Sequence, residues 1–239
     1  MPIQLLDQER DRGGLLCDVD ENPPFAVGFY AKHCKRALDA FLATACLILL
    51  SPVLGFLACC IKLTSRGPLL FRQVRVGKGG RPFQILKFRS MVVHSLPTDK
   101  MITIAGDPRV TAMGKVLRRY KFDELPQLWN VIRGDMSLVG PRPELPVYVS
   151  GYTPDQRIVL YARPGITDPA SLAYRHEEEI LAEQSDAEQF YRTQILPDKL
   201  TRSRAYLQQI TFRNDIHIIL KTISSSFLPS GKIEIRRSL

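Results

Sequence analysis

Metal-binding cysteine patterns, internal repeats and low-complexity tracts are all absent from this 239-residue sequence. The cysteines are Cys17, Cys34, Cys46, Cys59 and Cys60. None of them forms a Cys-x-x-Cys pair, so we interpret them as reduced, small apolar side chains in or beside the cytoplasm. The charged residues that precede Cys17 exclude the apolar core of a secretory signal. These absences argue against a disulfide scaffold, a zinc module and a repeat protein.

Positive charge is in excess. The chain carries 33 Lys and Arg against 24 Asp and Glu, a net charge of +9. This excess suits a polyanionic partner, which could be nucleic acid, an anionic membrane surface or a phosphorylated substrate. No helix-turn-helix or aromatic RNA-binding signature is present. The apolar content of 45% and the length are sufficient for one folded domain with an appendage.

A long stretch without any charge runs from Ala40 to Ile61. Its 22 residues would form a helix about 33 Å long, enough to cross the hydrocarbon core of a bilayer. Pro52 lies at the midpoint, lacks a backbone donor and crowds the preceding turn. Ser51 can bond back to a nearby carbonyl and help to bend the helix. We therefore predict a membrane helix over residues 31–62 that is broken at Ser51-Pro52, with each half about 16 Å long.

Positive residues flank this stretch on both sides. They are Lys32, Lys35 and Arg36 before it, and Lys62, Arg66, Arg72 and Arg75 after it. Because a spanning helix usually has positive charge on one side only, the pattern favours a re-entrant helix that leaves through the face by which it entered. A kinked spanning helix is the alternative. The re-entrant arrangement places residues 1–36 and 62–239 on the cytoplasmic face.

The remaining patterns predict an α+β fold, with a mainly helical cytoplasmic domain over residues 63–239 and a small β-hairpin. Residues 70–76 and 83–88 alternate around a glycine-rich turn, which predicts the hairpin. Its basic side chains could contact lipid headgroups or substrate phosphates, or could simply be solvated. The polar residues 1–30 are interpreted as a loosely ordered leader. Glu177, Glu178 and Glu179 are interpreted as the solvated face of an acidic helix.

Two adjacent carboxylates, Asp123 and Glu124, stand in front of a predicted helix. Leu125, Leu128, Trp129 and Ile132 follow at helical spacing, and Gly134 ends the helix. In this position Asp123 is commonly an N-cap, with Pro126 in the first turn. A second interpretation is chemical: an ionised carboxylate near bound phosphate can hold a divalent metal or attack phosphorus.

The arginine of "VGPRPE" lies between two prolines. Pro141 and Pro143 fix the backbone on both sides of Arg142. An arginine on a stiff turn is well suited to bidentate contact with an anion. The alternative is an ordinary surface turn.

The order of these motifs resembles the bacterial sugar transferases, the monotopic polyprenyl-phosphate phosphoglycosyl transferases. The segments that carry the resemblance are "KRALDAFLA", "GPLLFRQVRVGKGGRPFQILKFRSM", "LRRYKFDELPQLWNVIRGDMSLVGPRPE" and "RPGIT". The resemblance runs from about Lys35 to Thr167 and recurs weakly near Asp215. The chain resembles a short member of the family that has only the catalytic domain. After Thr167 the sequence departs from the family pattern, which leaves the identity of the sugar open.

The resemblance implies transfer of a sugar 1-phosphate from a UDP-sugar to polyprenyl (undecaprenyl) phosphate, the first membrane step of glycan or exopolysaccharide assembly. It implies that Asp123 is the nucleophile of a covalent intermediate and that Glu124 helps to hold Mg²⁺. Substrate-binding residues implied in the same way are Arg118, Pro141, Arg142, Pro143, Lys87, Arg89 and Asp215.

The implied partners are UDP-sugar, polyprenyl phosphate and anionic lipids of the bacterial inner membrane, on its cytoplasmic face. No nucleic acid is implied, and a homodimer stays open. Two other functions compete with this one. A membrane-anchored nucleic-acid-binding protein explains the charge but leaves the acidic pair without a role. A membrane-associated phosphoanhydride hydrolase would use the same carboxylates without needing a polyprenyl acceptor.

Overall fold

The computed structural model describes residues 23–92 and 102–227, so most of the predicted leader lies outside the described residues. The helices are α2 (Lys35–Thr64), α3 (Ala112–Arg119), α4 (Gln127–Arg133), α5 (Pro146–Val149), α6 (Pro154–Arg157), α7 (Pro169–Ala173), α8 (Glu177–Ala182), α9 (Ala187–Phe190), α10 (Leu196–Leu207) and α11 (Phe212–Phe227). The strands are β1 (Leu70–Val76), β2 (Pro82–Phe88), β3 (Ser137–Val139) and β4 (Gly165–Thr167). The fold is mainly helical with a small β-hairpin, as predicted.

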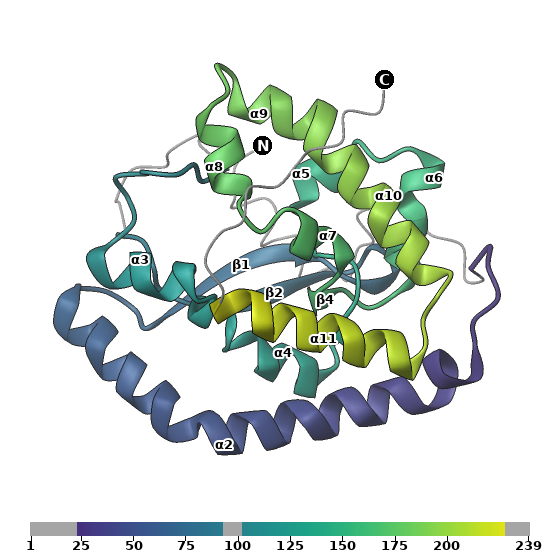
Figure 1. Cartoon of the computed structure of the whole chain (residues 1–239), viewed down its shortest axis with the longest axis horizontal. Helices are drawn as coiled ribbons and strands as arrows, with labels where there is room; N and C mark the ends of the chain where they lie inside the picture. The colour runs from purple at the N-terminus through teal and green to yellow at the C-terminus, as the bar shows by residue number, and fades with distance from the viewer. Residues whose placement is uncertain (1–22, 93–101, 228–239) are drawn as a thin grey trace.

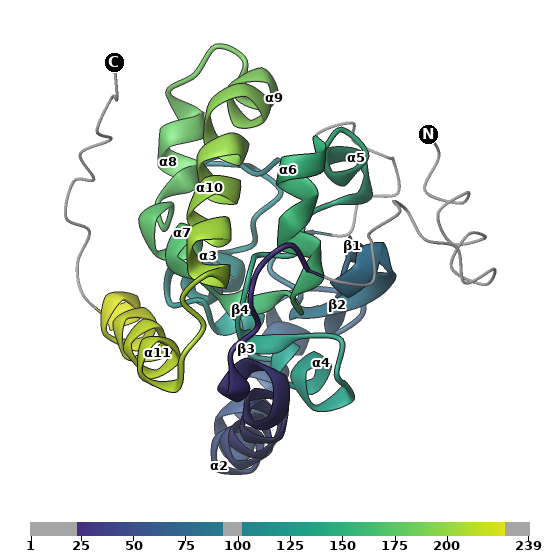
Figure 2. The same cartoon turned by 90° about the vertical axis from the view of Figure 1, so that its right-hand side faces the viewer.

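The elements are arranged in layers. Figures 1 and 2 show α2 along one edge of the molecule, the β-hairpin and α4 in the middle, and α8, α9 and α10 on the side away from α2. Strands β1 and β2 pair antiparallel, from Leu70 opposite Phe88 to Val76 opposite Pro82. Between them the chain turns at Gly79 and Gly80, whose φ angles of 67° and 73° lie in the left-handed region that glycine adopts without strain. The predicted hairpin is confirmed.

A second pair of strands, β3 and β4, was not predicted. These strands are parallel and place Ser137 beside Gly165 and Val139 beside Thr167. The backbones at Gly140 and Gly165 are in close contact, since a Cβ atom on Gly165 would lie 2.1 Å from the amide nitrogen of Gly140. This contact fixes where the chain enters the Pro141–Pro143 turn.

Helix α2 is continuous through Pro52, so the predicted break into two helices is wrong. Pro52 cannot donate to the carbonyl of Ile48, four residues earlier. The hydroxyl of Ser51 donates to that same carbonyl at 2.8 Å and replaces the missing donor. The helix therefore continues with a change of direction, which is visible in Figure 1.

The two ends of α2 pack against the rest of the protein. Ala43 lies in a cluster with Phe83 and Val131, while Leu57 and Ile61 pack with Phe88 and Leu117. The middle of the helix turns large apolar side chains outward, namely Phe41, Ile48, Leu49, Val53 and Phe56. The segment Tyr30–Thr64 is long and apolar enough to cross a membrane, with a mean hydropathy of 2.4 in its most apolar window and 11% of that window buried.

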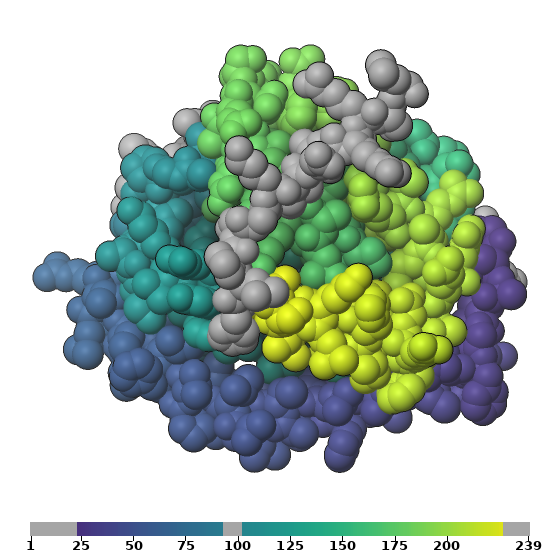
Figure 3. Space-filling model, viewed as in Figure 1, coloured from purple at the N-terminus to yellow at the C-terminus, as the bar shows by residue number. Residues whose placement is uncertain are grey.

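A buried polar cluster joins the start of α2 to α10 and α11. The carboxylate of Asp215 accepts hydrogen bonds from Tyr206 at 2.6 Å and Tyr30 at 3.1 Å, and pairs with Lys35. In the view of Figure 3, α11 lies above α2, and the ion pair between Lys35 and Asp215 joins the starts of the two helices. Since Asp215 is only 2% exposed, its charge depends on these partners for stabilisation.

Candidate active site

Asp123 and Glu124 lie in a short 3₁₀ turn, Phe122–Glu124, that precedes α4. Helix α4 begins later, and its N-cap residue is Pro126. The interpretation of Asp123 as the N-cap is therefore wrong. Asp123 is 6% exposed, and within the described part of the chain its Oδ1 atom is buried without a hydrogen-bond partner. Since an unpaired buried carboxylate oxygen is costly, the fold alone does not account for this side chain.

Backbone strain precedes the acidic pair. Lys121 has a φ angle of 59° and is the one non-glycine residue with positive φ in residues 23–92 and 102–227. This left-handed conformation costs a lysine roughly 1 kcal/mol or more. It lies between α3 and the 3₁₀ turn, so this strained residue leads directly into the segment that carries the two carboxylates.

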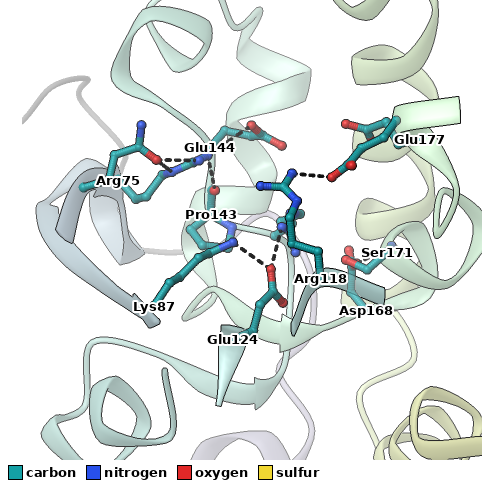
Figure 4. Close-up of polar contacts among 12 residues, drawn as sticks. Arg75, Lys87, Arg118, Glu124, Pro143, Glu144, Asp168, Ser171 and Glu177 are labelled. Atoms are coloured by element: carbon teal, nitrogen blue, oxygen red, sulfur yellow. Dashed lines mark hydrogen bonds and ion pairs between the residues drawn. The ribbon is translucent and has the colours of Figure 1, made fainter. Parts of the chain in front are cut away.

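Glu124 is held by two cations from distant parts of the chain. Lys87, on β2, donates to its Oε1 atom at 2.7 Å, and Arg142, on the Pro141–Pro143 turn, donates to the same atom at 3.0 Å. Figure 4 shows Lys87 and Glu124 pointing toward each other between β2 and the turn. The structure thus brings together four of the predicted site residues: Lys87, Asp123, Glu124 and Arg142.

The two neighbouring carboxyls have opposite pKa shifts. Burial raises the pKa of Asp123 above its ordinary value of 3.8, and Lys87 only partly offsets this. Burial alone would also raise the pKa of Glu124, but Lys87 and Arg142 outweigh it and hold that pKa well below 4.5. Glu124 is therefore a fixed anion, whereas Asp123 is the more basic carboxylate of the pair.

The turn that carries Arg142 is fastened to β1. Arg75 donates from Nη1 to the carbonyl of Pro143 at 3.2 Å, and the amide of Val76 donates to the carbonyl of Glu144 at 3.0 Å. Tyr191 donates to the carboxylate of Glu144 at 2.9 Å. Arg142 therefore reaches Glu124 from a backbone that is fixed on both sides.

Asn130, which sequence reasoning missed, joins α4 to β2. Its side chain is fully buried. It accepts from the amide of Leu86 at 3.0 Å and donates to the carbonyl of Gln84 at 2.7 Å. These bonds occupy backbone groups of β2 next to Lys87, so they set the distance between Lys87 and the acidic pair. A single asparagine in an amphipathic helix gives no signal of such a contact.

The other predicted site residues lie elsewhere or have other partners. Arg118 pairs with Glu178 near the acidic pair. Arg89 donates to carbonyls at the end of α2, including that of Ser65 at 2.7 Å, and Asp215 binds the start of α2. Among the described residues neither Arg89 nor Asp215 contacts the acidic pair; in this structure the two residues hold opposite ends of one helix.

The acidic pair fits one mode of magnesium binding. Within the described ranges, no group of three or more His, Cys, Asp or Glu residues could form a protein cage for a metal. Mg²⁺ commonly binds one or two carboxylates and completes its shell with water and substrate phosphates. Asp123, with an unpartnered oxygen, and Glu124 can supply those carboxylates, so their chemistry fits this mode.

The family model and the individual relatives that match this chain point to the same family. The family model described as "Bacterial sugar transferase" matches residues 30–228. The UDP-glucose:undecaprenyl-phosphate glucose-1-phosphate transferase of Caulobacter vibrioides is 41% identical over 195 residues, covering 80% of this chain and 68% of the relative.

Two further relatives are 38% identical. One is the UDP-N-acetylgalactosamine-undecaprenyl-phosphate N-acetylgalactosaminephosphotransferase of Aeromonas hydrophila, with 79% of this chain and 42% of the relative covered. The other is the UDP-glucose:undecaprenyl-phosphate glucose-1-phosphate transferase of Escherichia coli K12, with 81% and 40% covered. The chain therefore spans less than half the length of these two relatives.

The shared ion pair at Glu124 predicts a pH-dependent change in stability. Because the pKa of Glu124 is depressed in the folded protein, the pair contributes stability above pH 4.5, and this contribution is lost as the pH falls through the folded value. Lys87→Met should raise the pKa of both carboxyls. It should lower the free energy of unfolding at pH 7 by about 3 kcal/mol and flatten the loss of stability in acid.

Thermal unfolding of the detergent-solubilised protein between pH 3 and pH 7 measures this effect. Lys115→Met, which changes an exposed lysine on α3, is the control and should follow the wild-type curve. A Lys87→Met curve parallel to that of the wild type would show that Lys87 does not set the pKa of Glu124.

Proposed function

The chain belongs to the bacterial sugar transferase family, and we propose that it transfers a sugar 1-phosphate from a UDP-sugar to undecaprenyl phosphate. The products are a polyprenyl diphosphate sugar and UMP. The donor named for the Caulobacter relative is UDP-glucose and that for the Aeromonas relative is UDP-N-acetylgalactosamine, so the family accepts more than one sugar. No nucleic-acid partner is part of this proposal.

The observation that carries the proposal is the unequal pair of carboxylates. Glu124 is neutralised by Lys87 and Arg142, whereas Asp123 keeps one buried oxygen without a partner among the described residues. A carboxylate with a raised pKa and a free oxygen is a good nucleophile once it is ionised. The adjacent cations are well placed to stabilise the negative charge of a diphosphate and of the transition state.

Asp123 would act in two displacement steps. In the first, its carboxylate oxygen forms a bond to the phosphorus that bears the sugar, and the bond from that phosphorus to the UMP oxygen breaks with its electron pair. In the second, an oxygen of undecaprenyl phosphate attacks the same phosphorus and releases the Asp123 carboxylate. Two steps allow a soluble and a lipid substrate to use one small site in turn.

We further propose that Mg²⁺ binds at Asp123 and Glu124 together with the phosphates of the donor. When bound, the ion would neutralise phosphate charge and polarise the phosphoryl group. Lys87 and Arg142 would continue to hold Glu124 and so keep its carboxylate correctly oriented. The unpartnered oxygen of Asp123 supports this proposal.

Helix α2 is proposed to be re-entrant, with both of its ends on the cytoplasmic face and its apolar surface in lipid. In support, Asp215 binds Lys35 at one end and Arg89 binds Ser65 at the other. A spanning helix about 45 Å long could not keep both contacts with one domain. An N-terminal tag should be protected from an impermeant reagent in intact cells and labelled only after permeabilisation. Labelling from outside would contradict this topology.

Asp123→Asn tests the reaction. The amide has nearly the same shape but cannot attack phosphorus, so UMP release should fall by more than about 1,000-fold. Wild-type enzyme with UDP-sugars and undecaprenyl phosphate should release UMP and not UDP, as nucleotide-resolved chromatography would measure. Asp155→Asn, at an exposed side chain, is the control. Sustained turnover without acceptor would indicate a hydrolase, and near wild-type activity of Asp123→Asn would exclude the nucleophilic role.

Removal of the metal provides a separate test. Excess chelator should stop UMP release, and added Mg²⁺ should restore it. Glu124→Gln should raise the Mg²⁺ concentration required for half-maximal activity about tenfold or more. If the enzyme retained full activity in excess chelator, the magnesium proposal would be wrong.

A further inference from the structure

Arg118 has an unusual environment beside the acidic pair. Its positive charge acts on Asp123 and lowers the pKa of that carboxyl, against the larger effect of burial. Its Nη2 atom donates to Glu178, while its Nε atom is buried and has no acceptor among the described residues. Figure 4 shows the guanidinium of Arg118 turned away from Glu124, toward the acidic residues of α8. The side chain is therefore only partly paired and can donate to another anion.

Helix α8 brings three consecutive glutamates to this side of the molecule. Glu177 pairs with Lys199 and Glu178 with Arg118. The side chain of Glu179 contacts His176 and is 65% exposed. The predicted solvated face therefore holds for Glu179 and in part for Glu178, whereas the side chain of Glu177 is only 24% exposed and is paired. This helix lies in the stretch after Thr167, where the sequence departs from the family pattern.

The ion pair between Arg118 and Glu178 is open to solvent at its acidic end. The side chain of Glu178 is 40% exposed, compared with 11% for Glu124. Because solvent screens the attraction, such a pair stabilises the protein only weakly. A phosphate group offers arginine a bidentate, charge-assisted contact that is stronger. A phosphate near Asp123 would therefore compete successfully for Arg118.

Because both are negatively charged, the Glu178 carboxylate and a phosphate cannot bind Arg118 at the same time. A diphosphate brought close to Arg118 would stand next to the Glu178 carboxylate, and like charges a few ångströms apart repel each other. The carboxylate must leave Arg118 for the phosphate to take its place. Its exposed position allows this movement without opening the core.

We propose that Glu178 occupies, in the free enzyme, the position at Arg118 that a phosphate oxygen of the nucleotide-sugar donor takes, and so weakens donor binding. This proposal rests on the proposed function for the identity of the donor. It makes Glu178 a residue that tunes the donor concentration at which the enzyme works. The residue takes no part in the bond-making steps.

Glu178→Gln tests the competition. The amide keeps the size of the side chain and removes the charge, so the KM for the UDP-sugar should fall about fivefold, the equivalent of losing a weak ion pair. The kcat and the KM for undecaprenyl phosphate should not change. Binding of inorganic pyrophosphate, measured by calorimetry on detergent-solubilised protein, should tighten by a similar factor. This second readout does not depend on turnover.

Two matched variants distinguish the contact between Glu178 and Arg118 from a general effect of negative charge on α8. Glu179→Gln removes the same charge one residue further along α8 and should leave the KM unchanged. Glu178→Asp keeps the charge but is one methylene shorter, so it should lose the contact and resemble Glu178→Gln.

An unchanged or raised KM for Glu178→Gln would overturn the proposal, because a residue that orients Arg118 for the donor would give a higher KM. Equal effects of Glu178→Gln and Glu179→Gln would also overturn it and would indicate a general field effect. If the wild type turned over no UDP-sugar while Glu178→Gln still bound pyrophosphate more tightly than the wild type, the proposed function would fail and the competition at Arg118 would stand.

Discussion

The carboxylate of Glu124, shared by Lys87 and Arg142, is the interaction on which the site depends. It joins three segments that are far apart in the sequence: strand β2, the 3₁₀ turn before α4 and the Pro141–Pro143 turn. A buried carboxylate is stable only when such partners surround it. Since both cations bind Glu124, the adjacent Asp123 is left with an unpartnered oxygen within the described structure. One carboxylate is neutralised by cations, and its neighbour keeps an unpartnered oxygen.

Helix α2 is held by polar contacts at both ends and by apolar packing near them. Asp215 pairs with Lys35 at the start, and Arg89 binds the carbonyl of Ser65 at the end. Between these points the helix has an exposed apolar surface. The same element thus contributes to the core of the domain and offers a surface suited to lipid. This arrangement leaves an apolar surface of α2 open on the same domain that carries the acidic pair.

Local patterns predicted the local structure well. The hairpin follows from alternation and a glycine turn, and α4 ends at Gly134 because glycine readily adopts its φ of 94°. Lys87, Arg142 and the acidic pair were singled out by motif, and the structure brings them together. The chemical role of Asp123 stays a prediction.

Features that depend on distant partners were not predictable in this way. The β3–β4 pairing and the contacts of Asn130 join residues that no local period relates. The predicted bond from the Ser51 hydroxyl to a nearby carbonyl is present, but it accompanies a continuous α2 and not the predicted break. The position of Asp123 was misjudged because Lys121 adopts a left-handed conformation that a lysine rarely takes. The ion pairs of Glu177 and Glu178 were not predicted, because their cationic partners come from α10 and α3.

The covalent role of Asp123 is the central claim, and peptide mass spectrometry after incubation with UDP-sugar alone tests it most directly. With no acceptor present, the peptide that contains Asp123 should gain the mass of one sugar phosphate, and undecaprenyl phosphate should remove it. Acid-quenched wild-type enzyme that turns over yet carries no such adduct, or carries it on another residue, would contradict the account.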